Sequence, residues 1–118
     1  MLGGVLSRIK KKKIGKILER LSQQIPIKNY RKIKDYLYEF PDMLDLVPKV
    51  VETTQQFFPN EFLVLDIYDD PECNDRYLVL YIKPQNYNES FYKRLEEVRE
   101  CYLYELIDKK GWIQLMWR

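Results

Sequence analysis

The fold is decided by residues 61–84, which read EFLVLDIYDDPECNDRYLVLYIKP. Aliphatic residues recur at every second position in both halves of this stretch. That period of two predicts two β-strands, residues 61–68 and 76–83, because successive side chains of a strand point to opposite faces. The acidic segment between them, residues 69–75, is expected to be the loop of a hairpin.

An antiparallel pairing of these strands sorts their side chains by chemistry. Pairing Ile67 with Leu78 and Leu63 with Ile82 places six aliphatic side chains on one face of the hairpin. The opposite face is mixed and carries tyrosines together with Asp66. The remaining elements are therefore expected to cover the aliphatic face.

The flanking sequence predicts four helical segments and one more strand. Asn29 is the expected N-cap of the second helix, and either Asn86, with Glu89 three residues later, or Asn88 is the expected N-cap of the last helix. Gly111 is expected to end the last helix in the left-handed conformation. Cys101 is expected to be a small core residue of that helix. The predicted helices span residues 6–23, 29–40, 48–58 (after a turn at 42–46) and 89–110, and the strand spans residues 112–118.

This order predicts an α+β fold with two layers, in which N-terminal helices precede a ββαβ unit with a small three-stranded sheet. We divide the 118 residues into a basic helical N-terminal extension, residues 1–40, and an α+β domain, residues 41–118. The longest apolar run, residues 77–82, is far shorter than the ~20 residues that span a bilayer. The two cysteines lack C-x-x-C spacing, which favours a reducing, cytoplasmic setting.

The residue inventory argues against an enzyme. The sequence contains no histidine, which excludes histidine-based triads, histidine zinc ligands and the commonest general base. Its four glycines form no phosphate-binding loop, and its serines lie in no G-x-S-x-G context. We therefore expect a protein without catalytic activity and without a cofactor.

The acidic cluster of the hairpin is the one candidate for metal-dependent chemistry. Carboxylates gathered on a loop supply the oxygen ligands that Mg²⁺ or Ca²⁺ prefers, and a nuclease or phosphotransferase centred there is the alternative from the class of enzymes. The favoured interpretation is a solvated turn that binds nothing, because Asp and Pro suit turn geometry. The candidate ligands are Asp66, Asp69, Asp70 and Glu72, with Asp75 nearby.

Charge divides the chain into a basic end and an acidic body. Residues 1–36 hold eleven Lys or Arg residues and two acidic ones, a net charge of +9, whereas the remainder has a net charge of −7. Residues 8–34 could contact nucleic-acid phosphates, a partner protein or the acidic body of a second copy; an anionic membrane surface is the least favoured alternative. The candidate nucleic-acid contacts are Arg8, Lys10, Lys11, Lys12, Lys13, Lys16 and Arg20.

The mixed face of the hairpin is the candidate site for a partner protein. If no helix covers it, its aromatic side chains form a patch of the kind found at protein interfaces. The alternative is that the N-terminal helices fold back and bury it. The candidate contact residues are Tyr68, Tyr77, Tyr81, Trp112 and Met116.

A succession of short motifs begins at the end of the third helix. The motifs are Phe57-Phe58-Pro59, Leu63 and Leu65, Asp70-Pro71-Glu72, and then Leu78, Leu80 and Ile82. This succession resembles a group of short, uncharacterised bacterial proteins, many of them cyanobacterial. The resemblance covers residues 47–118, excludes the basic N-terminus, and implies a small cytoplasmic accessory protein; some relatives look like partners in toxin–antitoxin-type gene pairs. It implies no catalytic residue.

Taken together, the sequence predicts a non-catalytic protein-interaction module that is antitoxin-like or an accessory subunit, with a protein partner or self-association. The basic N-terminal helix would be a second contact. The first alternative is a nucleic-acid-binding protein that uses this helix, and the second is the carboxylate enzyme described above.

Overall fold

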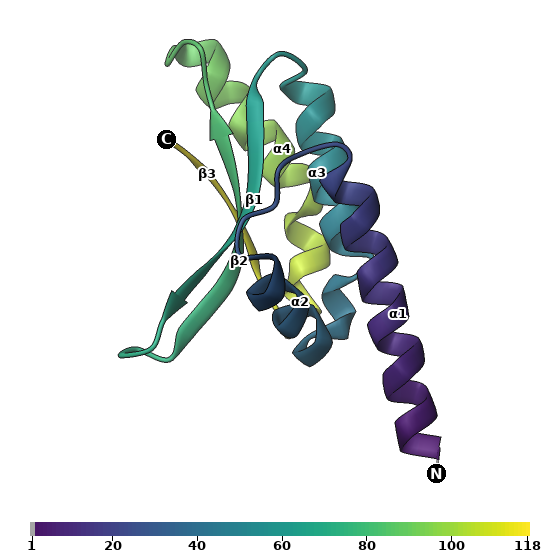
Figure 1. Cartoon of the computed structure of the whole chain (residues 1–118). Helices are drawn as coiled ribbons and strands as arrows, with labels where there is room; N and C mark the ends of the chain where they lie inside the picture. The colour runs from purple at the N-terminus through teal and green to yellow at the C-terminus, as the bar shows by residue number, and fades with distance from the viewer. Residues whose placement is uncertain (1) are drawn as a thin grey trace.

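The computed structural model describes residues 2–118, and the surroundings of side chains from Ser7 onward. The predicted α+β class is confirmed, with N-terminal helices ahead of a ββαβ unit (Figure 1). The elements in chain order are α1 (Leu2–Ser22), α2 (Tyr30–Glu39), the short 3-10 helix η1 (Pro41–Met43), α3 (Leu46–Phe57), β1 (Phe62–Asp70), β2 (Asp75–Lys83), α4 (Glu89–Ile107) and β3 (Ile113–Trp117).

The sheet is mixed and has the order β1-β2-β3. β1 and β2 are antiparallel, and the predicted pairs Ile67–Leu78 and Leu63–Ile82 are both present. β2 and β3 are parallel, so the chain must cross over between them, and α4 provides this crossover. β2 is therefore the central strand and shares its hydrogen bonds with both neighbours.

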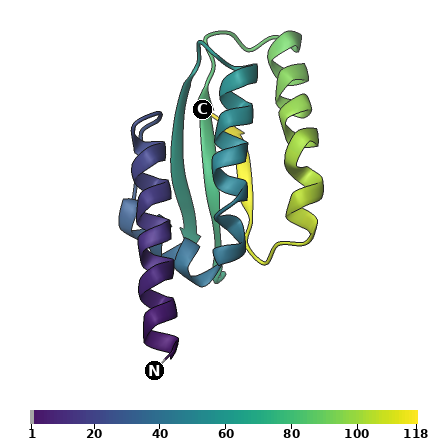
Figure 2. The ribbon, with the colours of Figure 1, turned by 90° about the vertical axis from the view of Figure 1, so that its right-hand side faces the viewer.

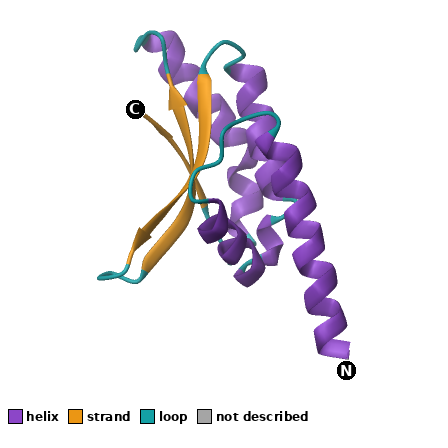
Figure 3. Ribbon diagram, viewed as in Figure 1, coloured by secondary structure: helices purple, strands orange, loops and turns teal. Residues whose placement is uncertain are grey.

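All helices lie on one side of the sheet. Figure 2 shows α1, α3 and α4 side by side in front of the strands, and Figure 3 shows the strands in one layer and the helices in the other. Leu65, Leu80 and Leu115 form a row across the three strands, and all three are fully buried under the helices. The same core includes Ile14 and Leu18 of α1, so the basic helix is packed onto the domain through its apolar stripe.

Both edges of the sheet are contacted by other parts of the chain. At the outer edge of β1, the Leu65 N–H donates to the Pro26 carbonyl (3.0 Å), and the Lys28 N–H donates to the Leu65 carbonyl (2.9 Å). At the outer edge of β3, the Arg99 guanidinium donates to the Leu115 carbonyl (3.0 Å). Backbone groups that β-strands leave unpaired at an edge are thus partly satisfied within the chain.

The hairpin is longer than predicted. β1 continues to Asp70 and β2 begins at Asp75, so three of the seven residues of the expected acidic loop are strand and residues 71–74 form the turn. Asn74 adopts a left-handed conformation (φ 52°), which asparagine tolerates better than most residues. The turn is tight because of this residue, and the hairpin tip extends away from the helices (Figure 1).

One predicted helix cap is present, and the other is right in its position but wrong in its side-chain bond. The Asn88 side chain accepts the Phe91 N–H (2.9 Å), as expected for the N-cap of α4. Asn29 occupies the N-cap position of α2 but is left-handed (φ 53°) and caps nothing with its side chain. Its carboxamide instead donates to Asp66 on β1 (2.9 Å), because the chain enters α2 directly from its contact with the edge of that strand.

The expected role of Gly111 is also wrong. No glycine among the described residues has a positive φ, and α4 ends at Ile107, before the predicted residue 110. Gly111 is buried, and a Cβ atom built there would lie 2.5 Å from Cγ of Met43 and 3.1 Å from Cβ of Phe40. The glycine is therefore required by close packing of the α4–β3 connection on η1, not by backbone conformation.

Alanine at the two interior glycines is expected to have opposite effects on stability. Gly111→Ala should lower the free energy of unfolding by at least about 1 kcal/mol, because the new methyl group displaces the fully buried Met43. Gly15→Ala should raise it by up to about 1 kcal/mol, because nothing lies within 4 Å of the new methyl group and alanine favours the helix. Urea denaturation of both variants measures the two changes, and equal effects would contradict this packing.

Cys101 is exposed, contrary to the expected core position. Leu103 and Ile107, which are expected to widen the apolar face of α4 together with Cys101, are exposed as well. The buried stripe of α4 is narrower than predicted because this helix lies at the end of the helix layer and touches neighbours on fewer sides (Figure 2). It consists of Phe91, Leu95, Val98, Tyr102 and Leu106.

Candidate protein-interaction surfaces

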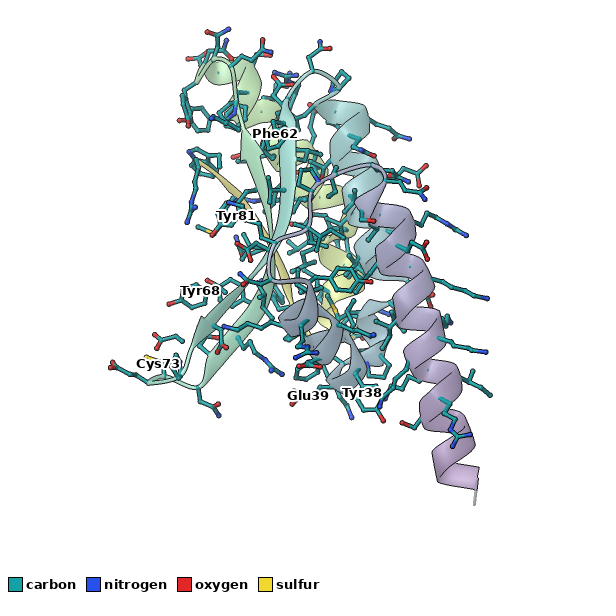
Figure 4. The ribbon with its side chains drawn as sticks, in the orientation of Figure 1. Tyr38, Glu39, Phe62, Tyr68, Cys73 and Tyr81 are labelled. Carbon is teal, nitrogen blue, oxygen red and sulfur yellow. The ribbon has the colours of Figure 1, made fainter. Side chains whose placement is uncertain are left out.

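The side of the sheet that faces away from the helices, called the open face below, is built from alternate residues of the three strands. The pairing registers bring these residues next to one another, and Figure 4 shows Tyr68 and Tyr81 projecting away from the helices. The open face consists of Phe62, Val64, Asp66 and Tyr68 of β1, Tyr77, Val79, Tyr81 and Lys83 of β2, and Gln114 and Met116 of β3.

The five candidate contact residues from the sequence come together on this face. Tyr68 and Tyr77 are paired across the hairpin and their rings stack, with 4.9 Å between ring centroids. Tyr81 is in register with Met116 on the neighbouring strand. Trp112 lies just before β3, and its indole N–H donates to the Gln114 side chain (3.1 Å). The N-terminal helices do not cover these residues, which decides between the two alternatives left open by the sequence (Figure 1).

A buried tyrosine holds the start of β3 in place. The Tyr36 hydroxyl of α2 accepts the backbone N–H of Trp112 (2.9 Å), so it connects the helix layer to the sheet. Burial raises the pKa of Tyr36, and the bond to Trp112 together with the nearby Arg76 guanidinium partly opposes that rise. Trp112 is therefore presented on the open face by a fixed backbone.

Phe62 is the most exposed apolar residue of the open face, with 56% of its surface accessible, and sequence reasoning did not include it among the contacts. The alternation of β1 places it on the same face as Tyr68, so the signal was present in the pattern. Val79, at the centre of the face, is only 1% exposed because the larger side chains around it cover it. The accessible apolar surface consequently lies around the rim of the face.

A groove of about 290 Å³ indents the open face at its Phe62 end. Two of its lining residues, Lys28 and Arg118, come from outside the named strands. Sequence reasoning missed both, because Lys28 reaches the groove only through the contact of its segment with the β1 edge. The lining consists of Lys28, Phe62, Val64, Asp66, Tyr81, Ile82, Lys83 and Arg118.

The opposite end of the open face is acidic. The Tyr68 hydroxyl lies 3.5 Å from an Asp70 carboxylate oxygen, and the negative charge of Asp70 raises the pKa of Tyr68. The pKa of Asp70 is lowered, first by a hydrogen bond from the Cys73 side chain and further by the backbone N–H groups of Cys73 and Glu72. The charge of the face thus changes sign from the groove to the hairpin tip.

The candidate metal ligands are not gathered around a common point. Asp66 accepts the Ile67 N–H (2.7 Å) and the Asn29 carboxamide, and Asp70 accepts the backbone N–H groups of the turn. Asp69 lies 4.0 Å from Lys32 of α2. Within the described residues, no group of three or more Asp, Glu, Cys or His side chains is arranged to hold a metal ion. These carboxylates serve the geometry of the hairpin and its contact with α2.

The candidate nucleic-acid contacts lie along α1, on the far side of the helix layer from the open face (Figure 1). All are exposed except Lys10, which is half-buried and lies 4.6 Å above the ring of Tyr38. A groove of about 420 Å³ between α1 and α2 is lined by Lys11, Arg31 and Lys34, with Asp35 as the one carboxylate. The packing of the two helices therefore concentrates positive charge that the sequence distributes over residues 8–34.

Comparison of the chain with profiles of known protein families, with curated proteins and with solved structures found no match. Among the helices of the described residues, none combines the length and the apolar character needed to cross a membrane.

Proposed function

We propose that this protein is a non-catalytic interaction module that binds a partner protein through its open face. The observation that carries the proposal is a three-stranded sheet with helices on one side only and accessible aromatic residues on the other. Isolated apolar residues are normal on a protein surface, but several accessible aromatic side chains gathered on one face of a sheet are typical of an interface. Large aromatic side chains also dominate the binding energy of known interfaces.

The rigidity of the face supports this assignment. Most of its contact residues lie on paired strands. The Tyr68–Tyr77 stack restrains two of the side chains, and the Tyr36–Trp112 hydrogen bond restrains the backbone of Trp112. A preorganised surface loses less conformational entropy when it binds. An antitoxin-like or accessory role, and a cytoplasmic location, are the finer parts of the proposal and follow from the resemblance and from the two unpaired cysteines.

The second candidate function is binding of nucleic acid by the groove between α1 and α2. The observation that favours it is the convergence of Lys11, Arg31 and Lys34 on that groove. Phosphate neutralisation by such a cluster gives an affinity that falls steeply with salt. The two helices that form the basic groove, α1 and α2, lie on the helix side of the sheet, away from the open face (Figure 1).

The test is a tagged pull-down from the native host with matched variants. Phe62→Ala/Tyr81→Ala should lose its protein partner, with a loss of affinity of about 30-fold if the two residues contribute about 2 kcal/mol. Tyr104→Ala/Ile107→Ala is the control, because these side chains of α4 are 81% and 71% exposed and lie outside the open face. The partner should be retained by this control.

Nuclease treatment separates the two candidate functions. A partner that survives the nuclease and depends on Phe62 and Tyr81 supports the protein-binding module. Two results would replace the first proposal by the second. One is the loss of all partners on nuclease treatment. The other is a loss of partners in Lys11→Glu/Lys34→Glu that does not occur in Phe62→Ala/Tyr81→Ala.

A further inference from the structure

The groove at the Phe62 end of the open face has an apolar floor and a charged rim. Phe62, Val64 and Tyr81 contribute the apolar surface, and the exposed Phe62 ring forms one wall. Lys28, Lys83 and Arg118 contribute three positive charges. They come from three separate parts of the chain, so the tertiary fold brings together charges that no local motif in the sequence shows.

Backbone hydrogen bonds or strand pairing hold the main chain at each of these three basic residues. The Lys28 N–H is bonded to the Leu65 carbonyl (2.9 Å), and the Arg118 N–H is bonded to the Ile82 carbonyl (3.1 Å). Lys83 is opposite Phe62 in the β1–β2 register. The Arg118 guanidinium lies 4.5 Å from the centroid of the Tyr81 ring, which keeps it beside the apolar floor.

The groove contains more positive than negative charge, with three cations and one carboxylate in its lining. Among the described residues, none of its three cations is within ion-pair distance of a carboxylate, although Lys32, Lys49, Arg76 and Arg94 elsewhere are. The one carboxylate in the lining, Asp66, is already bonded to the Asn29 carboxamide and the Ile67 N–H. A ligand that brings apolar surface and negative charge together would match both properties of the groove.

We propose that this groove binds a short segment of a partner protein that presents an apolar or aromatic side chain next to two or more carboxylates. The inference rests on the proposed function, because it names the chemistry of the partner at the open face. The reversal of charge along the face favours a peptide over a nucleic-acid strand. A polyanion that followed the sheet from the groove would meet Asp66 and then the acidic hairpin tip around Asp70, where its phosphates would be repelled.

The test is selection of a random dodecapeptide phage library on the full-length protein. The wild type should enrich sequences that combine Asp or Glu with Phe, Leu or Trp. Lys83→Glu/Arg118→Glu should shift the enrichment from acidic to basic residues, because it reverses the charge of two rim positions. A selected acidic peptide, measured by fluorescence polarisation, should bind this variant at least about tenfold more weakly, with an affinity for the wild type that falls as salt rises.

The control variant is Lys93→Glu/Lys110→Glu, which has the same change in net charge at exposed positions outside the groove. It should leave both the selected sequences and the peptide affinity unchanged. Circular dichroism and thermal melting show whether each variant is folded. If Lys83→Glu/Arg118→Glu is unfolded, the single variant Arg118→Glu is used in its place.

The outcomes distinguish the inference from the proposed function. Peptides that depend on Phe62 and Tyr81 but show no acidic enrichment, or no response to charge reversal, would overturn the inference and leave the open face as a protein-binding surface. If no selected peptide and no captured partner depends on the open face, both the inference and the proposed function are overturned. Binding of labelled dT12 with the same dependence on Lys83 and Arg118, without acidic peptides, would make the groove a nucleic-acid site and also overturn the inference.

Discussion

Alanine in place of Leu80 is expected to lower the free energy of unfolding by about 2–5 kcal/mol. Leu80 is fully buried on the central strand, in register with the fully buried Leu65 and Leu115 of its two neighbours. Its truncation removes apolar burial and leaves a cavity between the sheet and the helices, which the paired strands cannot close by moving. Equilibrium urea denaturation measures the loss as a shift of the midpoint at constant m-value.

The adjacent residue provides the matched control. Tyr81 follows Leu80 on β2 but lies on the open face, where it is only half-buried and contacts Arg118. Tyr81→Ala is expected to cost about 1 kcal/mol or less, because water already reaches the site. It should weaken partner binding instead. Equal losses of stability for the two variants would contradict a sheet packed on one side only.

The free energy of unfolding is expected to fall by about 2–3 kcal/mol as the pH rises from 10 to 12, because of Tyr102 alone. Burial raises the pKa of Tyr102 from its ordinary value of 10.0 to about 12, and nearby Arg99 partly opposes the rise. In this interval the unfolded chain has released the phenol proton and the folded protein retains it. The contribution of the protonated Tyr102 phenol to the free energy of unfolding is therefore complete below pH 10 and is lost as the pH passes through 12.

Tyr102→Phe isolates this contribution. Phenylalanine keeps the buried ring of α4 and has no proton to release, so the variant should lack that part of the pH dependence. Tyr36, whose pKa burial also raises, titrates in both proteins and cancels from the comparison. Guanidinium denaturation at several pH values between 9 and 12 gives the two profiles, and parallel profiles would contradict the burial of the Tyr102 hydroxyl.

The hairpin register was predictable because pairing Ile67 with Leu78 and Leu63 with Ile82 places six aliphatic residues of residues 61–84 on one face. The caps and helix ends were less predictable, since they depend on tertiary contacts. Asn29 has the right chemistry for an N-cap, but Asp66 from a distant strand binds its side chain. Gly111 has the right position for a left-handed cap, but Met43 of η1 is the neighbour that requires a glycine.

The candidate site was predictable where it follows strand periodicity. Tyr68, Tyr77 and Tyr81 are brought to one face by the alternation of side chains alone. The rim charges of the groove were not predictable, because Lys28 and Arg118 reach it through contacts between segments distant in sequence. The exposure of Cys101 depends in the same way on which side of α4 has a neighbour, and periodicity does not supply that information.

The occupied edges of the sheet have a consequence for the protein at high concentration. Amyloid-like fibrils grow when a free edge adds strands from further molecules in a cross-β stack. Here the contacts of Pro26 and Lys28 occupy the middle of β1, and β3 is short and has the Arg99 guanidinium on its Leu115 carbonyl. A charged side chain on an edge strand must be displaced before another strand can pair there. The accessible aromatic face can therefore remain in water for a partner without the edges starting a fibril.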